Sequence, residues 1–332
     1  MEKKRIEWID SLKGALMIGV IWSHSSANTG GGYWLTACYM AAFYFISGYI
    51  SGNKNQKLSV LLKEKAKRLL FPCFVYGVVL VGIDVILSGT QGSLNKLIGV
   101  FYSRYMLFPH DLNNNVFFLK SYNSTLWFLT SMFLTSICFD AFRKCQRKKI
   151  FVLILFVLGY VLMYFPVLLP WSIDSVPVTT LIMIAGYYFR GVSLDSFSVK
   201  NKIVVLIVLL PIYLICITIN QGINLSIREY GSDGIKGYLF YYIISLIGAV
   251  ILMILFSVLP ILKGLIFVGR HTMTYMCLQI FTLAISYKVF MFVHINDVVS
   301  GWIGVCVTLI MIWLVIKFYE AVSKKIKLFK YL

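Results

Sequence analysis

The sequence predicts an all-α integral membrane protein with about ten transmembrane helices and with both termini in the cytoplasm. Three observations support this fold class. Of the 332 residues, 59% are hydrophobic and only 13% are charged, whereas about a quarter of the residues in a soluble domain are charged. Apolar runs close to the ~20 residues that cross a bilayer recur along the whole chain. The connecting segments alternate between rich and poor in basic residues.

The apolar runs define the expected helices one by one. They cover residues 11–28, 34–52, 69–88, 124–142, 150–168, 176–190, 203–220, 237–260, 273–293 and 300–318. The sixth range is the shortest; it begins beside Pro177 and ends at Arg190. No linker or low-complexity stretch separates the runs, so we expect a single transmembrane domain over residues 1–332.

The distribution of charge supports an even number of helices. The chain has 31 Lys and Arg against 13 Asp and Glu, a formal net charge of +18. With the N-terminus inside, 24 of the 31 basic residues fall in cytoplasmic segments and 5 in outer ones, as the positive-inside rule requires. Topology therefore explains the positive charge, and we expect no nucleic-acid partner. The seven cysteines form no CxxC pair, which indicates neither disulfides nor a metal site.

Two segments need separate interpretation. The basic start followed by an apolar run is similar to a signal peptide, but Asp10, Lys13 and His24 interrupt that run and no clear cleavage site follows. We therefore expect a retained first helix. The longest outer segment, 89–123, either closes over an outward cavity or is a solvated loop.

The first helix carries the most informative residues of the chain, Asp10, Lys13 and His24. A helix turns about 100° and rises about 1.5 Å per residue, so Lys13 and His24 lie within roughly 20° of one face and about 16 Å apart. Ionisable groups inside a membrane helix usually mark a functional site, and an imidazole is a natural general base. The alternative is structural: a histidine bonded to a neighbouring carbonyl, and a lysine that reaches the interface and pairs with Asp10.

Three other sets could contribute to a site. Ser47 and Tyr49 lie beside a glycine at the end of the second expected helix. They either line a channel or take part in ordinary helix packing. Four basic residues within 63–68 suit phosphate binding or follow from topology alone; Lys65, Lys67 and Arg68 are the donor-binding candidates. Trp127, at the outer start of the fourth helix, stacks on a sugar or anchors the helix at the interface.

Taken together, these motifs resemble those of the membrane acyltransferase family 3. In chain order they are Asp10-x2-Lys13-x10-His24, Phe45-Ile46-Ser47-Gly48-Tyr49, Lys65-x-x-Arg68 with Pro72, Leu126-Trp127-Phe128-Leu129 and Gly269-Arg270-His271-Thr272. The sequences around Val268 and Ile184 look most like the fucose-acetylase-type branch. The resemblance implies a ten-helix enzyme of the cell inner (plasma) membrane that O-acetylates sugars of surface glycans.

The resemblance also implies roles for particular residues. Lys13 and His24 match an Arg/Lys-x10-His motif that is central to activity, and Lys65-x-x-Arg68 matches a cytoplasmic Arg-x-x-Arg element. Lysine at positions 13 and 65 keeps the charge but loses the bidentate geometry of arginine. Gln279 stands near a place where family members often carry a histidine. The implied donor is acetyl-CoA or a related acyl-CoA, the acceptor is a carbohydrate, and no metal is implied; a homo-oligomer is left open.

Two functions from different classes are consistent with the residues. In the first, phosphates of the acyl-CoA bind the basic inner segment, and His24 deprotonates a carbohydrate hydroxyl that attacks the thioester. In the second, the protein is a transporter or flippase of a glycan or lipid-linked sugar, and the same charges line a translocation path. A structural partner in an envelope assembly fits the charged helix least well. Turnover of acyl-CoA separates the first function from the second.

Overall fold

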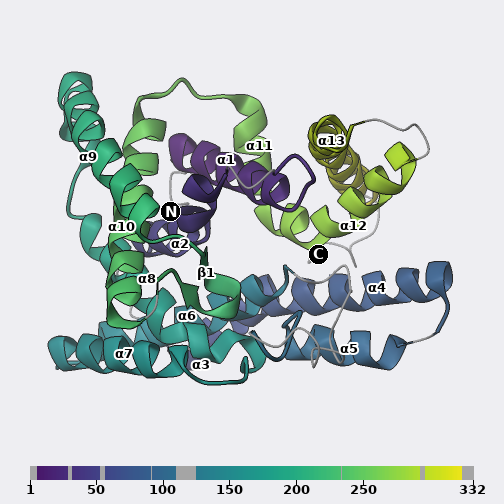
Figure 1. Ribbon diagram of the computed structural model, residues 1–332, viewed down its shortest axis with the longest axis horizontal. Helices are drawn as coiled ribbons and strands as arrows, with labels where there is room; N and C mark the ends of the chain where they lie inside the picture. The colour runs from purple at the N-terminus through teal and green to yellow at the C-terminus, as the bar shows by residue number, and fades with distance from the viewer. Residues whose placement is uncertain are drawn as a thin grey trace.

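The computed structural model describes residues 6–28, 32–52, 57–90, 92–109, 125–232, 234–291 and 296–323. Within these ranges the regular secondary structure is helical apart from a small antiparallel pair, β1 (Ile223–Asn224) and β2 (Glu229–Tyr230). Figure 1 shows the helices in two groups: α3 to α7 lie together, and α1, α2 and α8 to α13 form the rest of the molecule. Residues 110–123 of the expected outer segment 89–123 lie outside the described residues.

Each of the ten expected ranges overlaps one long helix. These helices are α1 (Glu7–Ser23), α2 (Tyr33–Tyr49), α4 (Phe71–Ser88), α6 (Trp127–Lys144), α7 (Lys148–Met163), α8 (Val176–Phe189), α9 (Val199–Ile219), α10 (Gly234–Val258), α12 (Thr272–Met291) and α13 (Asp297–Ser323). Shorter helices are α3 (Leu58–Lys65), α5 (Ser93–Tyr102) and α11 (Lys263–Arg270), with a π-helical turn, η1 (Ala66–Leu70), and 3₁₀ turns η2 (Pro170–Ser175), η3 (Leu194–Ser196) and η4 (Leu225–Ile227).

Four of the described helices are long and apolar enough to cross a membrane. They are Leu58–Leu87, Val199–Ile219, Gly234–Val258 and Asp297–Val322. The all-α membrane class is therefore supported. The number of ten spans and the cytoplasmic placement of both termini remain predictions.

The first helix ends earlier than the sequence suggests. The expected range reached residue 28, but α1 ends at Ser23 and His24 is its C-cap residue. The hydroxyls of Ser23 and Ser25 donate to the carbonyls of Val20 and Trp22, at 2.7 and 2.8 Å. Such side-chain bonds compete with the helical backbone, and a polar run therefore ends the helix at the point where the imidazole stands.

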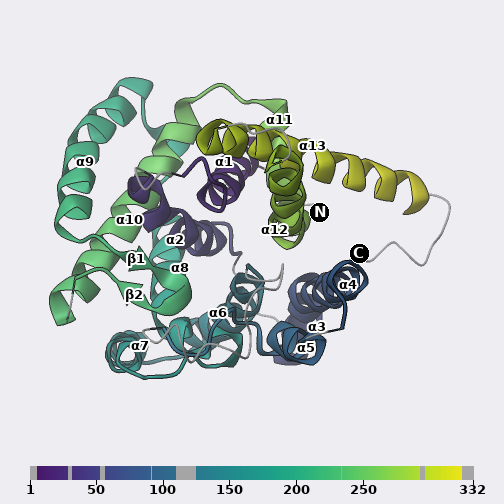
Figure 2. The ribbon, with the colours of Figure 1, turned by 45° about the vertical axis from the view of Figure 1, so that its right-hand side comes forward.

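The α1 helix lies near the centre of its group and packs against α2, α10, α11, α12 and α13 (Figure 2). Its closest neighbour is α11. A Cβ added at Gly14 would overlap the carbonyl oxygen of Leu265, and one added at Gly269 would overlap the carbonyl oxygen of Asp10. Glycine at both positions is therefore what lets the two backbones touch, a contact typical of small residues between membrane helices.

Connections expected on the same side of the membrane contact one another. Arg143 and Arg190, from two expected inner segments, donate to the carbonyls of Gly52 and Ser51 at 2.6 and 2.8 Å. On the expected outer side, the Ser26 hydroxyl donates to the Asp297 carbonyl at 2.7 Å, and the Tyr102 hydroxyl donates to that of Leu168 at 2.8 Å. These contacts agree with a chain that alternates between two sides.

Candidate active site

Two of the candidate residues, His24 and Trp127, border a cavity of about 470 Å³. Its walls come from the end of α1, the first half of α2, the start of α6 and the segment from β1 to η4, with contributions from α10 and α12. Hydroxyl and amide groups are frequent on these walls, and they include Ser23, Tyr39, Tyr105, Thr125, Asn224 and Ser226. A cavity of this size with a few convergent polar groups is typical of a small-molecule site.

His24 and Trp127 both line this cavity. The backbone N–H of His24 donates to the carbonyl of Ile21 at 3.2 Å and so completes the end of α1. No hydrogen bond of the His24 side chain is found among the described residues, and the residue is exposed because it borders open space. The imidazole is therefore accessible to a ligand inside the cavity.

His24 also borders a second cavity, of about 350 Å³. This cavity lies between α12 and α13 and is bounded on the α1 side by residues 24–26. Its lining includes Ile280, Leu283 and Ala284 from α12 and Gly304 from α13. Among the described lining residues, His24 is the one that both cavities share.

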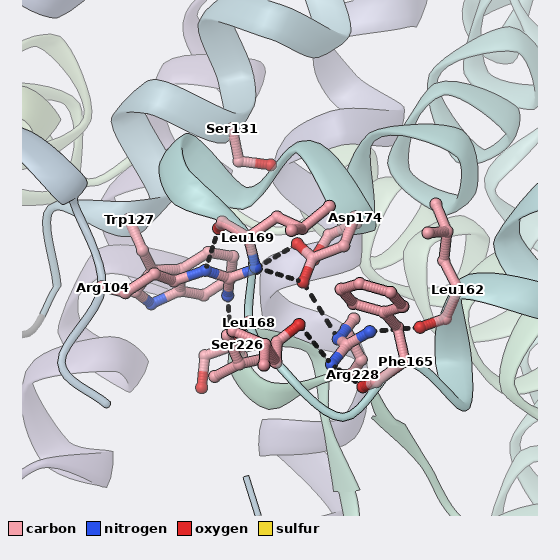
Figure 3. Close-up of polar contacts among 12 residues, drawn as sticks. Arg104, Trp127, Ser131, Leu162, Phe165, Leu168, Leu169, Asp174, Ser226 and Arg228 are labelled. Atoms are coloured by element: carbon pink, nitrogen blue, oxygen red, sulfur yellow. Dashed lines mark hydrogen bonds and ion pairs between the residues drawn. The ribbon is translucent and has the colours of Figure 1, made fainter. Parts of the chain in front are cut away.

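Beside the first cavity lies a buried ion cluster that joins three distant segments (Figure 3). The carboxylate of Asp174, in η2, pairs with Arg104 through one oxygen and with the Nε of Arg228, 3.0 Å away, through the other. The three side chains are almost completely shielded from solvent. We call Arg104, Asp174 and Arg228 the outer clamp.

The outer clamp fixes the wall of the first cavity. Arg104 also donates to the carbonyl of Ser226, and the Tyr105 hydroxyl lies 3.0 Å from the Ser226 hydroxyl. Ser226 and Tyr105 both line the cavity. Arg228 donates to the carbonyl of Phe165 at 2.7 Å and to that of Leu162. The clamp therefore holds η4 and the loop after α5 in place over the site.

The sequence did not identify the outer clamp as a unit. Arg104 and Arg228 are two of the few basic residues in expected outer segments, and Asp174 precedes the sixth expected helix. The small number of basic residues in the expected outer segments was the sequence feature that could have drawn attention to Arg104 and Arg228. Pairing them requires knowing that residues 70 positions apart meet, which spacing along the chain does not show.

Asp10 and Lys13 lie away from both cavities. The Asp10 carboxylate is 3.5 Å from the Nζ of Lys13 and 3.5 Å from the Nε of Arg270. These contacts stand where Gly269 touches α1, so two of the sequence motifs meet at one helix crossing. The three ionisable residues of the first helix therefore have different surroundings. His24 borders the cavities, whereas Asp10 and Lys13 lie where α1 packs against α11.

Ser47 and Tyr49 are absent from the described linings of both cavities. The Ser47 hydroxyl donates to the Phe43 carbonyl at 2.8 Å. The ring of Tyr49 packs against those of Trp8 and Phe189, each with centroids 6.2 Å away. The first contact is a hydrogen bond within α2, and the second is aromatic packing of α2 against α1 and α8 near their expected inner ends.

Lys65 is the N-cap residue of the π-helical turn η1, and Lys67 and Arg68 lie within this turn, directly before α4. Lys65 lies close enough to Arg68 and Arg143 for their charges to interact, and the Lys67 and Arg68 side chains are exposed. A π-helical turn inside a longer helix often marks a functional position. These basic side chains form a cluster of positive charge on the expected inner side, and two of them are exposed.

Comparison with known proteins assigns the family. The model of the acyltransferase domain, acyltransferase family 3, matches residues 6–318, a range that includes every candidate residue named above. Comparisons with curated proteins and with solved structures gave no significant match. A family model that matches nearly the whole chain establishes the family, and its members are acyltransferases. The chain belongs to acyltransferase family 3.

Proposed function

We propose that this protein is a membrane O-acyltransferase that moves an acetyl or other acyl group from cytoplasmic acyl-CoA to a hydroxyl of a cell-envelope carbohydrate. The observation that supports this proposal most strongly is the position of His24. Its imidazole is free of side-chain hydrogen bonds among the described residues and borders a hydroxyl-lined cavity together with Trp127. The family supplies acyl transfer, and the cavity supplies a place for a polar acceptor.

In the proposed reaction His24 acts as general base. Its neutral imidazole takes the proton of the acceptor hydroxyl while the hydroxyl oxygen attacks the thioester carbonyl carbon. A carbon–oxygen bond forms, the carbon–sulfur bond breaks, and the departing thiolate takes the proton from the imidazolium. The products are a carbohydrate ester and free CoA, and His24 returns to its neutral form. Transfer through an acyl-His24 intermediate gives the same products.

The composition of the first cavity suits a carbohydrate acceptor. Tyr105, Ser226 and Asn224 form a connected set, because the Ser226 hydroxyl donates to the Asn224 side-chain oxygen at 2.6 Å and meets Tyr105 at 3.0 Å. Trp127 offers an aromatic face beside them. Oriented hydroxyl and amide groups next to an aromatic ring match a ligand with alternating hydroxyl and apolar faces.

The donor is proposed to bind from the expected inner side. Lys65, Lys67 and Arg68 would hold the phosphates of CoA, because clustered Lys and Arg side chains are the usual phosphate ligands. The Asp10–Lys13–Arg270 contact lies at the α1–α11 crossing and would organise the inner path toward His24. Placement in the inner (plasma) membrane and the fucose-acetylase-type branch are part of this proposal.

Stoichiometry in a lipid-reconstituted sample tests the proposal against the transporter alternative. Purified wild-type protein is given acyl-CoA and envelope glycans, and free CoA and glycan ester are both measured. The proposal expects both products in a one-to-one ratio. Movement of glycan across the bilayer without release of CoA would support the transporter and contradict the enzyme.

A further inference from the structure

The second cavity differs in chemistry from the first. Serine residues at positions 25, 26 and 300 border it, but their hydroxyls already donate to backbone carbonyls. Ser25 donates to Trp22 at 2.8 Å, while Ser26 and Ser300 both donate to Asp297, at 2.7 and 2.8 Å. Besides His24, the other lining residues are Ile280, Leu283, Ala284 and two glycines, with Tyr287 adding an aromatic ring and one further hydroxyl. The surface left for a ligand is therefore largely apolar.

The second cavity is also larger than an acetyl group requires. At about 30 Å³ for a water-sized group, the volume of about 350 Å³ holds roughly twelve such groups. An acetyl group has two carbons and would leave most of this space empty. Apolar space without a ligand forgoes dispersion contacts, so the cavity fits a longer aliphatic chain.

His24 borders both cavities and so connects the proposed places of the acceptor and the acyl chain. The acceptor hydroxyl and the thioester carbonyl must both reach His24 in the proposed reaction. The first cavity offers hydroxyl and amide groups on one set of elements, and the second offers apolar groups between α12 and α13. An acceptor in the first cavity and an acyl chain in the second would bring the reacting atoms together at the imidazole.

We infer that the cavity between α12 and α13 is an acyl-chain pocket, and that the transferred group is an aliphatic acyl chain of about six to ten carbons. This inference rests on the proposed function. The bonds made and broken are those of that reaction: the acyl carbonyl carbon leaves sulfur for the acceptor oxygen, His24 carries the proton, and the chain beyond the carbonyl stays in the pocket.

Gly304 offers a direct way to fill the proposed pocket. A Cβ at Gly304 would meet its nearest neighbours, in Leu283 and Ser286, at 3.8 Å, which is ordinary van der Waals contact. A larger side chain can therefore grow into the cavity that Gly304 lines. Gly301 is unsuitable, because a Cβ there would overlap the backbone of Ala27. Gly82 in α4 has nothing within 4 Å of an added Cβ and lines neither cavity, so Gly82→Leu is a matched control.

The experiment measures release of CoA from acetyl-, butyryl-, hexanoyl-, octanoyl- and dodecanoyl-CoA by protein in lipid with envelope glycans. Wild type is compared with Gly304→Ala, Gly304→Leu and Gly82→Leu. We expect wild-type kcat/KM to be highest for hexanoyl or octanoyl donors. Gly304→Leu should move the preference toward acetyl at least tenfold, since one methylene group in an apolar pocket changes discrimination about 10- to 200-fold. Gly304→Ala should give a smaller shift, and Gly82→Leu none.

Each other result overturns the inference in a recognisable way. A wild-type preference for acetyl-CoA contradicts the acyl-chain pocket and leaves the proposed function intact. Equal losses with every donor in both Gly304 variants would place a different occupant there, such as the lipid tail of the acceptor. An unchanged preference in Gly304→Leu would place the chain elsewhere. No turnover of any acyl-CoA by wild type would remove the proposed function as well.

Discussion

Arg104 and Asp174 form an ion pair in which neither side chain retains solvent-accessible surface, although the two residues are 70 positions apart. Arg228 binds the second oxygen of the same carboxylate. Because Arg104 also binds the Ser226 carbonyl, a structural pair on the expected outer side is connected to the wall of the cavity that His24 borders. The wall of this cavity is therefore held by charged side chains that are absent from its described lining.

Removing the charge at the centre of the outer clamp should strongly destabilise the protein. Asp174→Asn leaves two buried guanidinium groups without their carboxylate, and breaking a buried pair from one side costs about 3–5 kcal/mol. The control is Glu320→Gln, which weakens the exposed Lys317–Glu320 pair and should cost roughly 0–1 kcal/mol. Thermal unfolding in detergent or lipid compares the two. Equal Tm values for the two variants would contradict the role of the clamp.

A methyl group between α1 and α11 should disturb the site from a distance. Gly269→Ala places its Cβ against the Asp10 carbonyl, where neither backbone can give way cheaply. We expect lower Tm and loss of most turnover. Gly264→Ala, on the same helix but with nothing within 4 Å of the added Cβ, should leave both unchanged or slightly improved, because alanine favours helix by about 1 kcal/mol. Similar effects of the two substitutions would refute the close crossing.

The basic segment before α4 should recognise the phosphates of the donor. Arg68→Gln is expected to raise KM for acyl-CoA about five- to tenfold while leaving kcat nearly unchanged, which is the pattern of lost uniform binding. A short acyl thioester without phosphates should be used equally well by wild type and variant. Lys200→Gln, at an exposed position near the start of α9, is the control. If the variant loses both donors equally, the segment does not bind phosphates.

Trp127 should act on the acceptor rather than on the donor. Trp127→Leu removes the aromatic face beside His24 and is expected to raise KM for the glycan about tenfold, with Trp127→Phe intermediate. Hydrolysis of acyl-CoA without acceptor should stay near the wild-type rate. A loss confined to that hydrolysis, with unchanged glycan KM, would place Trp127 in the donor site.

Much of the fold could be predicted from the sequence, because hydrophobic runs and their charged flanks depend on local composition. All ten expected ranges overlap long helices, and the family was recognisable from ordered motifs. The ends of helices were harder to predict, because the serines beside His24 end α1 through side-chain hydrogen bonds. Contacts between distant segments could not be predicted from the sequence. The pairing of Asp10 with Arg270 and the assembly of the outer clamp depend on tertiary packing.

The central claim is that the His24 imidazole carries the proton in acyl transfer, and its most direct test is acyl-CoA turnover by His24→Gln in lipid with envelope glycans. His271→Gln is the matched control, because His271 lies outside both described linings and binds the Phe267 carbonyl at 2.9 Å. We predict at least a 100-fold loss of turnover in His24→Gln with an unchanged Tm, within the range for a general base, and near wild-type turnover in His271→Gln. Wild-type turnover in a folded His24→Gln protein would contradict the account.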